Sequence, residues 1–195
     1  MFRCTKLDWG LHPDMVEIGA DGDGSCFFHS VSLGMFKPYQ REKTHDGQRY
    51  SRREHVVRLR TELSHLLPAH YNNLSRGALS EFSKTCTEYT MENMQRQLMS
   101  NEPVDNVYNE YISNILKIDL YIMDGENKKV MVLGDDSDIL YRNRNSVVLI
   151  YRPGHYNLVG IDKGEEVQTF FLPDNEFIKS IRKQMSGIIS GQSEK

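Results

Sequence analysis

The sequence predicts an α+β fold in which helices pack on a mostly antiparallel central sheet. A block of segments with helical spacing of apolar residues lies between residues 51 and 116. After residue 117 the period changes, and short β-branched or aromatic runs alternate with Gly, Asn and Asp. The length of 195 residues suits one domain with a single core. We therefore expect one domain over residues 1–190 and a polar C-terminal tail over residues 188–195.

The N-terminal part predicts a strand, a tight loop and a helix. Residues 15–18 form a short apolar run, and residues 19–24 contain three glycines and two aspartates before the next apolar run at 26–33. Residues 37–50 are polar and include Pro and Gly without a regular period. We therefore expect a long loop there, of the kind that can contact a partner or simply connect two elements.

The central part predicts helices. Residues 51–54 (SRRE) have the form of a capping box, so we expect a helix that begins at Ser51 and ends near Pro68. Two further helices are expected between residues 74 and 99. A clearer amphipathic helix follows Pro103 and runs over residues 104–116.

The C-terminal part predicts a meander of strands and one closing helix. The helix follows Pro173, and we expect Asp174 to be its N-cap. Its apolar face would consist of Phe177, Ile178, Ile181 and Met185. The expected strands cover residues 118–123, 130–133, 146–151, 156–161 and 167–172.

Charge and cysteine content narrow the function classes. The formal net charge is −3, and the 24 basic residues are spread along the chain, which gives no electrostatic reason to expect binding to nucleic acid or to an anionic membrane. Three widely spaced cysteines fit neither a secreted disulfide framework nor a zinc site. The N-terminus lacks the apolar core of a signal peptide. We expect a cytoplasmic monomer with reduced thiols and neither metal nor cofactor.

Cys26 is the candidate nucleophile. It lies where a glycine-rich loop meets a helix, and the free N–H groups and dipole of a helix start stabilise a thiolate. Gly22 and Gly24 allow backbone conformations that direct successive amides at one point, as an oxyanion hole requires. Asp23 can brace this loop by accepting backbone hydrogen bonds. A buried cysteine that only fills space is the alternative interpretation.

His155 is the candidate base, because Pro153 and Gly154 place it at a bend directly before a predicted strand. Asn157 lies two residues on, so both side chains share one face of that strand and the amide oxygen can accept the imidazole Nδ1–H. His29 is interpreted as structural. Four other histidines, His45, His55, His65 and His70, are expected to be solvated.

At these residues the sequence resembles the OTU (ovarian tumour) family of cysteine proteases. That family's nucleophile motif, Asp-Gly-x-Cys followed by an apolar residue, Phe or Tyr, and His or Arg, is matched by residues 23–29 (DGSCFFH). Its second block, a hydrophobic strand followed by His-Tyr-Asn or His-Tyr-Asp, is matched by residues 147–157 (VVLIYRPGHYN). The resemblance covers about residues 16–161. Ser25 replaces the commoner Asn, and no Trp-Gly pair stands directly ahead of the helix at residues 104–116, where many family members have one.

The resemblance implies a papain-like α+β core and hydrolysis of the isopeptide bond at the C-terminus of ubiquitin. Cys26 would be the nucleophile, His155 the base and then the acid, and Asn157 the residue that orients His155. Asp23 with the amides of Gly24 and Cys26 would form the oxyanion loop. The implied partners are ubiquitin, polyubiquitin chains or ubiquitin-like proteins, and the site of action is the cytosol, or the host cytosol for a virus or an intracellular pathogen.

Two other interpretations stay open. A papain-type peptidase is suggested by residues 24–27 (GSCF) and by the gap of about 130 residues between Cys26 and His155. Against it, Ala20 stands where such enzymes have a Gln, and paired cysteines are missing. A ubiquitin-binding pseudoprotease would keep the fold without turnover.

Overall fold

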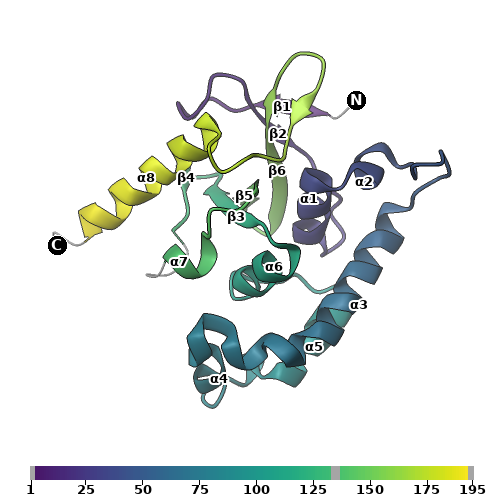
Figure 1. Ribbon diagram of the computed structural model, residues 1–195, viewed down its shortest axis with the longest axis vertical. Coiled ribbons are helices and arrows are strands. Elements are labelled where there is room, and N and C mark those ends of the chain that lie inside the picture. The colour runs from purple at the N-terminus through teal and green to yellow at the C-terminus, as the bar shows by residue number, and fades with distance from the viewer. Residues whose placement is uncertain (1–2, 133–136, 193–195) are drawn as a thin grey trace.

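A curled seven-stranded sheet lies between two helical layers (Figure 1). The computed structural model describes residues 3–132 and 137–192. The path of hydrogen-bonded neighbours is β1-β2-β6-β5-β3-β4, and β7 pairs with β6 beside this path. Of the strand pairs among the described residues, β3 with β5 is parallel and the others are antiparallel, which confirms the expected sheet. The strands are β1 (Cys4–Lys6), β2 (Met15–Ile18), β3 (Asp119–Asp124), β4 (Lys129–Val130), β5 (Ser146–Arg152), β6 (His155–Asp162) and β7 (Val167–Gln168).

The helices of the middle of the chain cover one face of the sheet, and the last helix covers the other (Figure 1). Two 3₁₀ segments, Tyr71–Gly77 and Thr87–Tyr89, connect helices in the first layer. The helices are α1 (Cys26–Met35), α2 (Lys37–Arg41), α3 (Arg52–His70), α4 (Ala78–Phe82), α5 (Met91–Met99), α6 (Tyr108–Leu116), α7 (Ser137–Leu140) and α8 (Glu176–Gln192).

The side chains of the central strands alternate between two hydrophobic clusters, as the period of a strand requires. On β5, Val147 and Leu149 pack under the first helical layer, whereas Val148 and Ile150 pack under α8. Gly34 brings α1 close to this sheet, because a Cβ at that position would lie 2.7 Å from Val147. Helix α1, which begins with the candidate nucleophile Cys26, is thus held directly against the strands that carry the histidine block.

Two sequence expectations about helix position are wrong. The span 37–50 contains α2, because Pro38 fits the first turn of a helix, where its missing N–H costs nothing. The N-cap of α8 is Asn175 and not Asp174, since the Asn175 side chain accepts a hydrogen bond of 2.9 Å from the N–H of Phe177. Helix α8 extends through residues 188–192 of the expected tail, and residues 193–195 lie outside the described residues.

Helix α3 begins as expected but runs past Pro68 to His70. At its start, Ser51 Oγ accepts a hydrogen bond from the N–H of Glu54. Proline cannot donate to the carbonyl four residues earlier, which belongs to Ser64. Gln95 of α5 supplies that donor, with Nε2 3.0 Å from the Ser64 carbonyl oxygen. A tertiary contact therefore replaces the helical bond that Pro68 removes.

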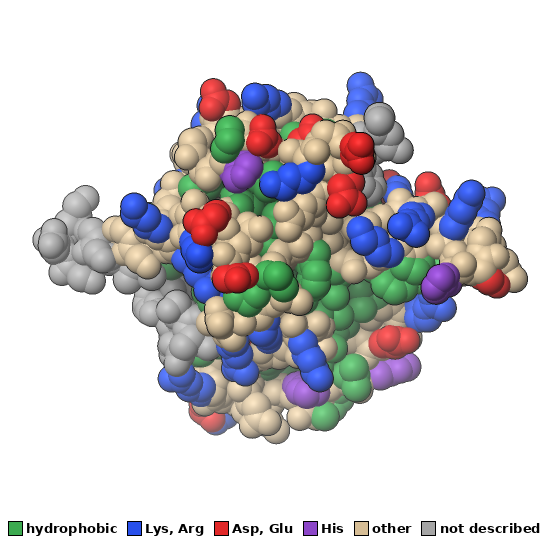
Figure 2. Space-filling model, turned by 45° about the horizontal axis from the view of Figure 1, so that its top comes forward, with side chains coloured by type: hydrophobic (Ala, Val, Ile, Leu, Met, Phe, Trp, Pro, Cys, Tyr) green, Lys and Arg blue, Asp and Glu red, His purple; other side chains and the backbone are tan. Residues whose placement is uncertain are grey.

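Acidic and basic side chains are interspersed on the face shown in Figure 2. No helix within the described ranges is long and apolar enough to cross a membrane.

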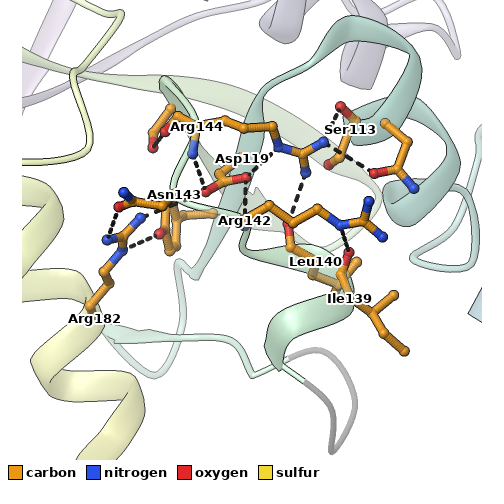
Figure 3. Close-up of polar contacts among 11 residues, drawn as sticks. Ser113, Asp119, Ile139, Leu140, Arg142, Asn143, Arg144 and Arg182 are labelled. Carbon is orange, nitrogen blue, oxygen red and sulfur yellow. Dashed lines mark hydrogen bonds and ion pairs between the residues drawn. The ribbon is translucent and has the colours of Figure 1, made fainter.

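Asp119 joins three segments at one end of the sheet (Figure 3). Its side chain is fully buried and accepts a 2.7 Å hydrogen bond from Arg144 Nε. The backbone N–H groups of Arg142 and Arg144 also donate to it, each at 3.1 Å. Arg182 of α8 lies 3.6 Å away. One carboxylate thus fixes the segment before β5 and the position of α8.

Replacing Asp119 by Ala should lower the free energy of unfolding by about 3 kcal/mol, because it leaves partly buried guanidinium groups and two N–H groups without their acceptor. Urea denaturation monitored by circular dichroism measures the change. Glu165→Ala, at an exposed position, is the matched control and should change stability by less than about 0.5 kcal/mol. An unchanged midpoint for the Asp119 variant would contradict this role.

His55 is half-buried in an aromatic cluster, so the expectation that it is solvated is wrong. Its ring stacks on Phe36 with 5.1 Å between centroids. Its nitrogens are hydrogen-bonded to the Tyr50 hydroxyl at 2.7 Å and to Ser32 Oγ at 3.0 Å. Burial, with the positive charge of Arg58, lowers the pKa of His55 to about 4. The imidazole is therefore neutral at physiological pH.

This lowered pKa predicts a pH-dependent stability. Between about pH 6.5 and pH 4 the unfolded chain binds a proton at His55 that the folded chain does not, so stability falls as the pH falls through that window. In His55→Gln the slope of the unfolding free energy against pH should fall by the amount that corresponds to about one bound proton. Urea unfolding across the window tests it, with His45→Gln in an exposed loop as the control. Equal slopes for wild type and His55→Gln would contradict the prediction.

Candidate active site

Cys26 is the first residue of α1 and is buried, with 5% of its surface exposed. Gly24 precedes it with a φ of +81°, a conformation that favours glycine. A Cβ on Gly24 would lie 2.1 Å from the carbonyl oxygen of Asn101, so the loop also passes very close to that segment. Gly22 has no such φ, but a Cβ there would lie 3.8 Å from His155 Cε1. Gly24 thus meets the expected conformational need, and Gly22 provides space beside the histidine.

The helix start next to Cys26 keeps its N–H groups available. Ser25 is the N-cap residue, yet its side chain makes no cap hydrogen bond. Its hydroxyl accepts instead from Arg60 Nη1 at 2.8 Å. The N–H groups in the first turn of a helix have no partner within the helix. They therefore remain able to bind negative charge that develops on a substrate beside Cys26.

Asp23 braces the loop, as the sequence predicts, and pairs with His29. Its Oδ1 accepts from the N–H of Ser25 at 3.0 Å. Its carboxylate also lies 3.1 Å from Nε2 of His29, whose Nδ1 contacts the Tyr39 hydroxyl. Burial raises the pKa of Asp23, but these hydrogen bonds outweigh burial and hold it below its ordinary value. Asp23 and His29 therefore hold the loop. The side chain hydrogen-bonded to His155 is that of Asn157.

The β5–β6 hairpin presents His155 as the first residue of β6. Arg152 and His155 are paired across it, and Gly154 in the turn has a φ of +76°. Pro followed by a glycine at positive φ is the pattern of a type II turn. The bend that the sequence predicts before His155 is therefore a two-residue hairpin turn.

Tyr156 joins this hairpin to α1. Its backbone N–H donates to Cys26 Sγ at 3.4 Å, and its carbonyl accepts from Ser30 Oγ at 3.1 Å. Its ring packs edge-on against Phe27, with 5.4 Å between centroids. Burial, with the neighbouring Tyr151 and Cys26, raises the pKa of Tyr156 to about 12, so its hydroxyl is neutral. These contacts bring the residue next to His155 against the sulfur of Cys26.

Asn157 holds His155 through a different ring nitrogen from the one that the sequence predicts. The Asn157 Oδ1 lies 2.9 Å from His155 Nε2. The same oxygen accepts from the N–H of Ala20 at 2.9 Å. Nε2 is the outer nitrogen of the ring and reaches along the strand to the residue two positions on, whereas Nδ1 lies close to the histidine backbone. Asn157 therefore holds the ring by Nε2 and not by Nδ1.

A cleft of about 320 Å³ opens beside Cys26. Its lining includes the loop residue Gly24 and the rings of Tyr151 and Tyr156. Pro103 and Val104 form another part of its wall. A larger cavity of about 920 Å³ contains Asn157 and Glu17 but not Cys26. The smaller cleft is thus the one that a bond attacked by Cys26 can enter.

Two charged residues that the sequence patterns did not indicate support this site. Arg60 is 2% exposed and donates to carbonyl oxygens of residues 97, 98 and 102, in addition to Ser25. The sequence feature that could have indicated Arg60 is its position four residues after Val56, which places a charged side chain on the apolar face of α3. Glu17 is 8% exposed and accepts from Asn157 Nδ2 at 2.7 Å. The sequence feature that could have indicated Glu17 is a carboxylate within the short apolar strand β2.

Within the described residues, no group of three His, Cys, Asp or Glu side chains could hold a metal ion.

No protein-family model and no curated protein sequence matches the chain. Solved structures do match it. An OTU domain solved in complex with ubiquitin has a TM-score of 0.58 at 15% identity, over 92% of this chain and 87% of that one. This chain has the fold of an OTU domain.

Two further OTU structures match less closely. An OTU deubiquitinase from Wolbachia pipientis has a TM-score of 0.48 at 16% identity, over 89% of this chain and 98% of that one. The viral OTU domain protease of Dera Ghazi Khan virus has a TM-score of 0.44 at 14% identity, over 83% and 96%. The OTU fold of this chain rests on the TM-score of 0.58, and it is the fold that the motifs around Cys26 and His155 predicted.

Replacing Gly24 by Ala should slow alkylation of Cys26 by chloroacetamide by at least about tenfold, because the new methyl group collides with the Asn101 carbonyl and displaces the loop. Mass spectrometry of peptides separates Cys26 from the other two thiols. Gly47→Ala is the matched control: its φ is +84°, but nothing lies within 4 Å of the added Cβ. It should cost about 1 kcal/mol of stability and leave Cys26 reactivity unchanged. Equal reactivity of the two variants would contradict this role of Gly24.

Proposed function

We propose that this protein is a cysteine-type deubiquitinase that hydrolyses the bond between the C-terminal glycine of ubiquitin and an amine. The proposal is carried by two contacts at the N-terminal end of α1. The Tyr156 amide donates to Cys26 Sγ, and His155 is hydrogen-bonded to Asn157. The similarity to an OTU domain that was solved with ubiquitin bound supports the choice of substrate. Ubiquitin-like proteins are a related class of substrate.

The reaction follows from the groups at the site. His155 Nδ1 takes the proton of the Cys26 thiol, and the sulfur attacks the carbonyl carbon of the glycine. The oxyanion is bound by N–H groups at the start of α1. The C–N bond then breaks, and the leaving amine takes its proton from His155. Water, deprotonated by His155, attacks the thioester, and cleavage of the C–S bond restores the thiol and releases the free carboxyl group.

The shape of the cleft suits this substrate. Its volume of about 320 Å³ leaves space for a narrow, extended chain, and its walls are mostly aromatic and apolar, with Asp105 and Asn106 as polar members. Tyr151 and Tyr156 pack against each other, with 5.1 Å between ring centroids, and together line the cleft. The C-terminal glycine of ubiquitin carries no side chain, so it can lie close against these rings. Branched side chains next to the scissile bond would be excluded by the same walls.

The test is a reaction of the protein with ubiquitin that carries a C-terminal electrophile, followed by intact mass measurement. Wild type should gain one ubiquitin mass, and Cys26→Ala should gain none because the attacking sulfur is absent. Cys4 and Cys86 remain in that variant and control for nonspecific thiol reactivity. Adducts on both proteins, or on neither, would contradict the proposal.

A second measurement separates an enzyme from a binding module. Cleavage of a fluorogenic amide at the ubiquitin C-terminus should be lost in Cys26→Ala, while ubiquitin binding by isothermal calorimetry should stay within a few-fold of wild type. A folded wild-type protein that binds ubiquitin but neither cleaves it nor forms an adduct would be a ubiquitin-binding module.

We propose the cytosol, including that of a host cell, as the place of action. A catalytic thiol must stay reduced, and the cytosol keeps thiols in that state.

A further inference from the structure

Glu17 closes a chain of polar contacts that starts at the candidate base. Its Oε1 accepts from Asn157 Nδ2 at 2.7 Å, and Asn157 in turn contacts His155. Arg152 donates two hydrogen bonds to the same carboxylate, from Nε to Oε1 at 3.0 Å and from Nη2 to Oε2 at 2.6 Å. The four residues come from three neighbouring strands, β2, β6 and β5. They therefore form one rigid unit of the sheet.

The two neighbours of Asn157 fix which way its amide points. The N–H of Ala20 can only donate, so the atom that it meets must be the amide oxygen. The carboxylate of Glu17 can only accept when ionised, so the atom that it meets must be the amide nitrogen. Reversing the amide would break both hydrogen bonds at once.

The charge of Glu17 is secure at neutral pH. Burial raises the pKa of this carboxyl, but the hydrogen bonds from Arg152 and Asn157 and the charge of Arg152 outweigh burial and hold the pKa below its ordinary value. Glu17 is thus a buried anion two hydrogen bonds from the imidazole. It supplies the negative charge that the neutral side chain of Asn157 lacks.

From this geometry we propose that Glu17 is a positioning residue of the proposed deubiquitinase, acting through Asn157 on His155. It locks the amide so that Oδ1 faces His155, which requires the neutral ring to carry its proton on Nε2 and to offer Nδ1 to the thiol. Its charge also stabilises the imidazolium that forms when His155 takes the thiol proton. The proposed active site therefore comprises four residues, Cys26, His155, Asn157 and Glu17.

The proposal rests on the proposed function but is tested by moving the charge. Glu17→Gln removes the anion and should slow turnover by about tenfold or more, with KM little changed, because a charge-assisted hydrogen bond is lost. Asn157→Asp alone places two carboxylates against each other, so one must hold a proton or move away. Its activity should fall increasingly as the pH rises.

The double variant Glu17→Gln/Asn157→Asp should recover activity to within a few-fold of wild type. The amide nitrogen introduced at position 17 can then donate to the carboxylate introduced at position 157, while the amide oxygen keeps the hydrogen bond from Arg152 Nη2 and only the one from Arg152 Nε is lost. That carboxylate can accept from His155 and Ala20, and the net charge beside Arg152 is unchanged. Residues that serve only as packing would give losses that add in the double variant. Glu165→Gln, at an exposed carboxylate without a role in the site, is the control for charge removal.

Two readouts are measured on each protein as a function of pH. One is alkylation of Cys26 by chloroacetamide, which does not involve ubiquitin, and the other is kcat and KM on a ubiquitin C-terminal amide. If Cys26 in the double variant is alkylated at nearly the wild-type rate, the role of Glu17 is supported even if the wild-type protein does not act on ubiquitin. Lack of action on ubiquitin would overturn the proposed function alone. Wild-type rates in Glu17→Gln, or additive losses in the double variant, overturn the role of Glu17.

One measurement needs no variant and covers the case in which Glu17→Gln does not fold. The ¹⁵N spectrum of the wild-type imidazoles should show neutral His155 protonated on Nε2. Protonation on Nδ1 would overturn the proposal, because Asn157 would then have to turn its NH₂ group toward the ring and its oxygen toward Glu17.

Discussion

Tyr156 is tied to α1 at two points one turn apart, by its N–H at Cys26 and by its carbonyl at Ser30. Because both contacts use the backbone of β6, they fix the strand itself and not only a side chain. His155 is the preceding residue on that strand, so its distance from Cys26 is set by how closely α1 lies on the sheet. Gly34 at the other end of α1 permits that close approach. The separation of thiol and imidazole is thus a property of helix-on-sheet packing.

Around this contact, buried charges act as supports. Arg60 ties the residue before the nucleophile to the segment at 97–102, which also forms the far side of Gly24. Asp23 pairs with His29 inside the same loop. Glu17, paired with Arg152, accepts a hydrogen bond from Asn157, which in turn contacts His155. A buried ion pair adds little net stability, because desolvation offsets the attraction, but a fully hydrogen-bonded network admits few alternative arrangements. The polar groups of the site are therefore better explained by geometry than by stability.

Sequence patterns predicted most elements because their signals are local. The period of apolar residues and the capping motif at Ser51 indicated α1, α3 and the central strands. The predictions failed where a distant partner decides. Pro68 would end an isolated helix, but Gln95 satisfies the carbonyl that it leaves free. His55 looks solvated on a charged helix, yet α1 and the Phe36 ring enclose it. β1 is three exposed residues and carries no period at all.

By itself the sequence determined the fold class, the order of elements and the choice of Cys26, His155 and Asn157 as candidates, because glycine-rich loops, bends and alternation act over a few residues. The tertiary structure decided how these candidates are used. It selected Nε2 of the imidazole as the nitrogen that faces Asn157, and it brought Glu17 to that amide from a strand 140 residues away along the chain. The reason is physical: a hydrogen bond between strands depends on register and strand order, which no local pattern contains.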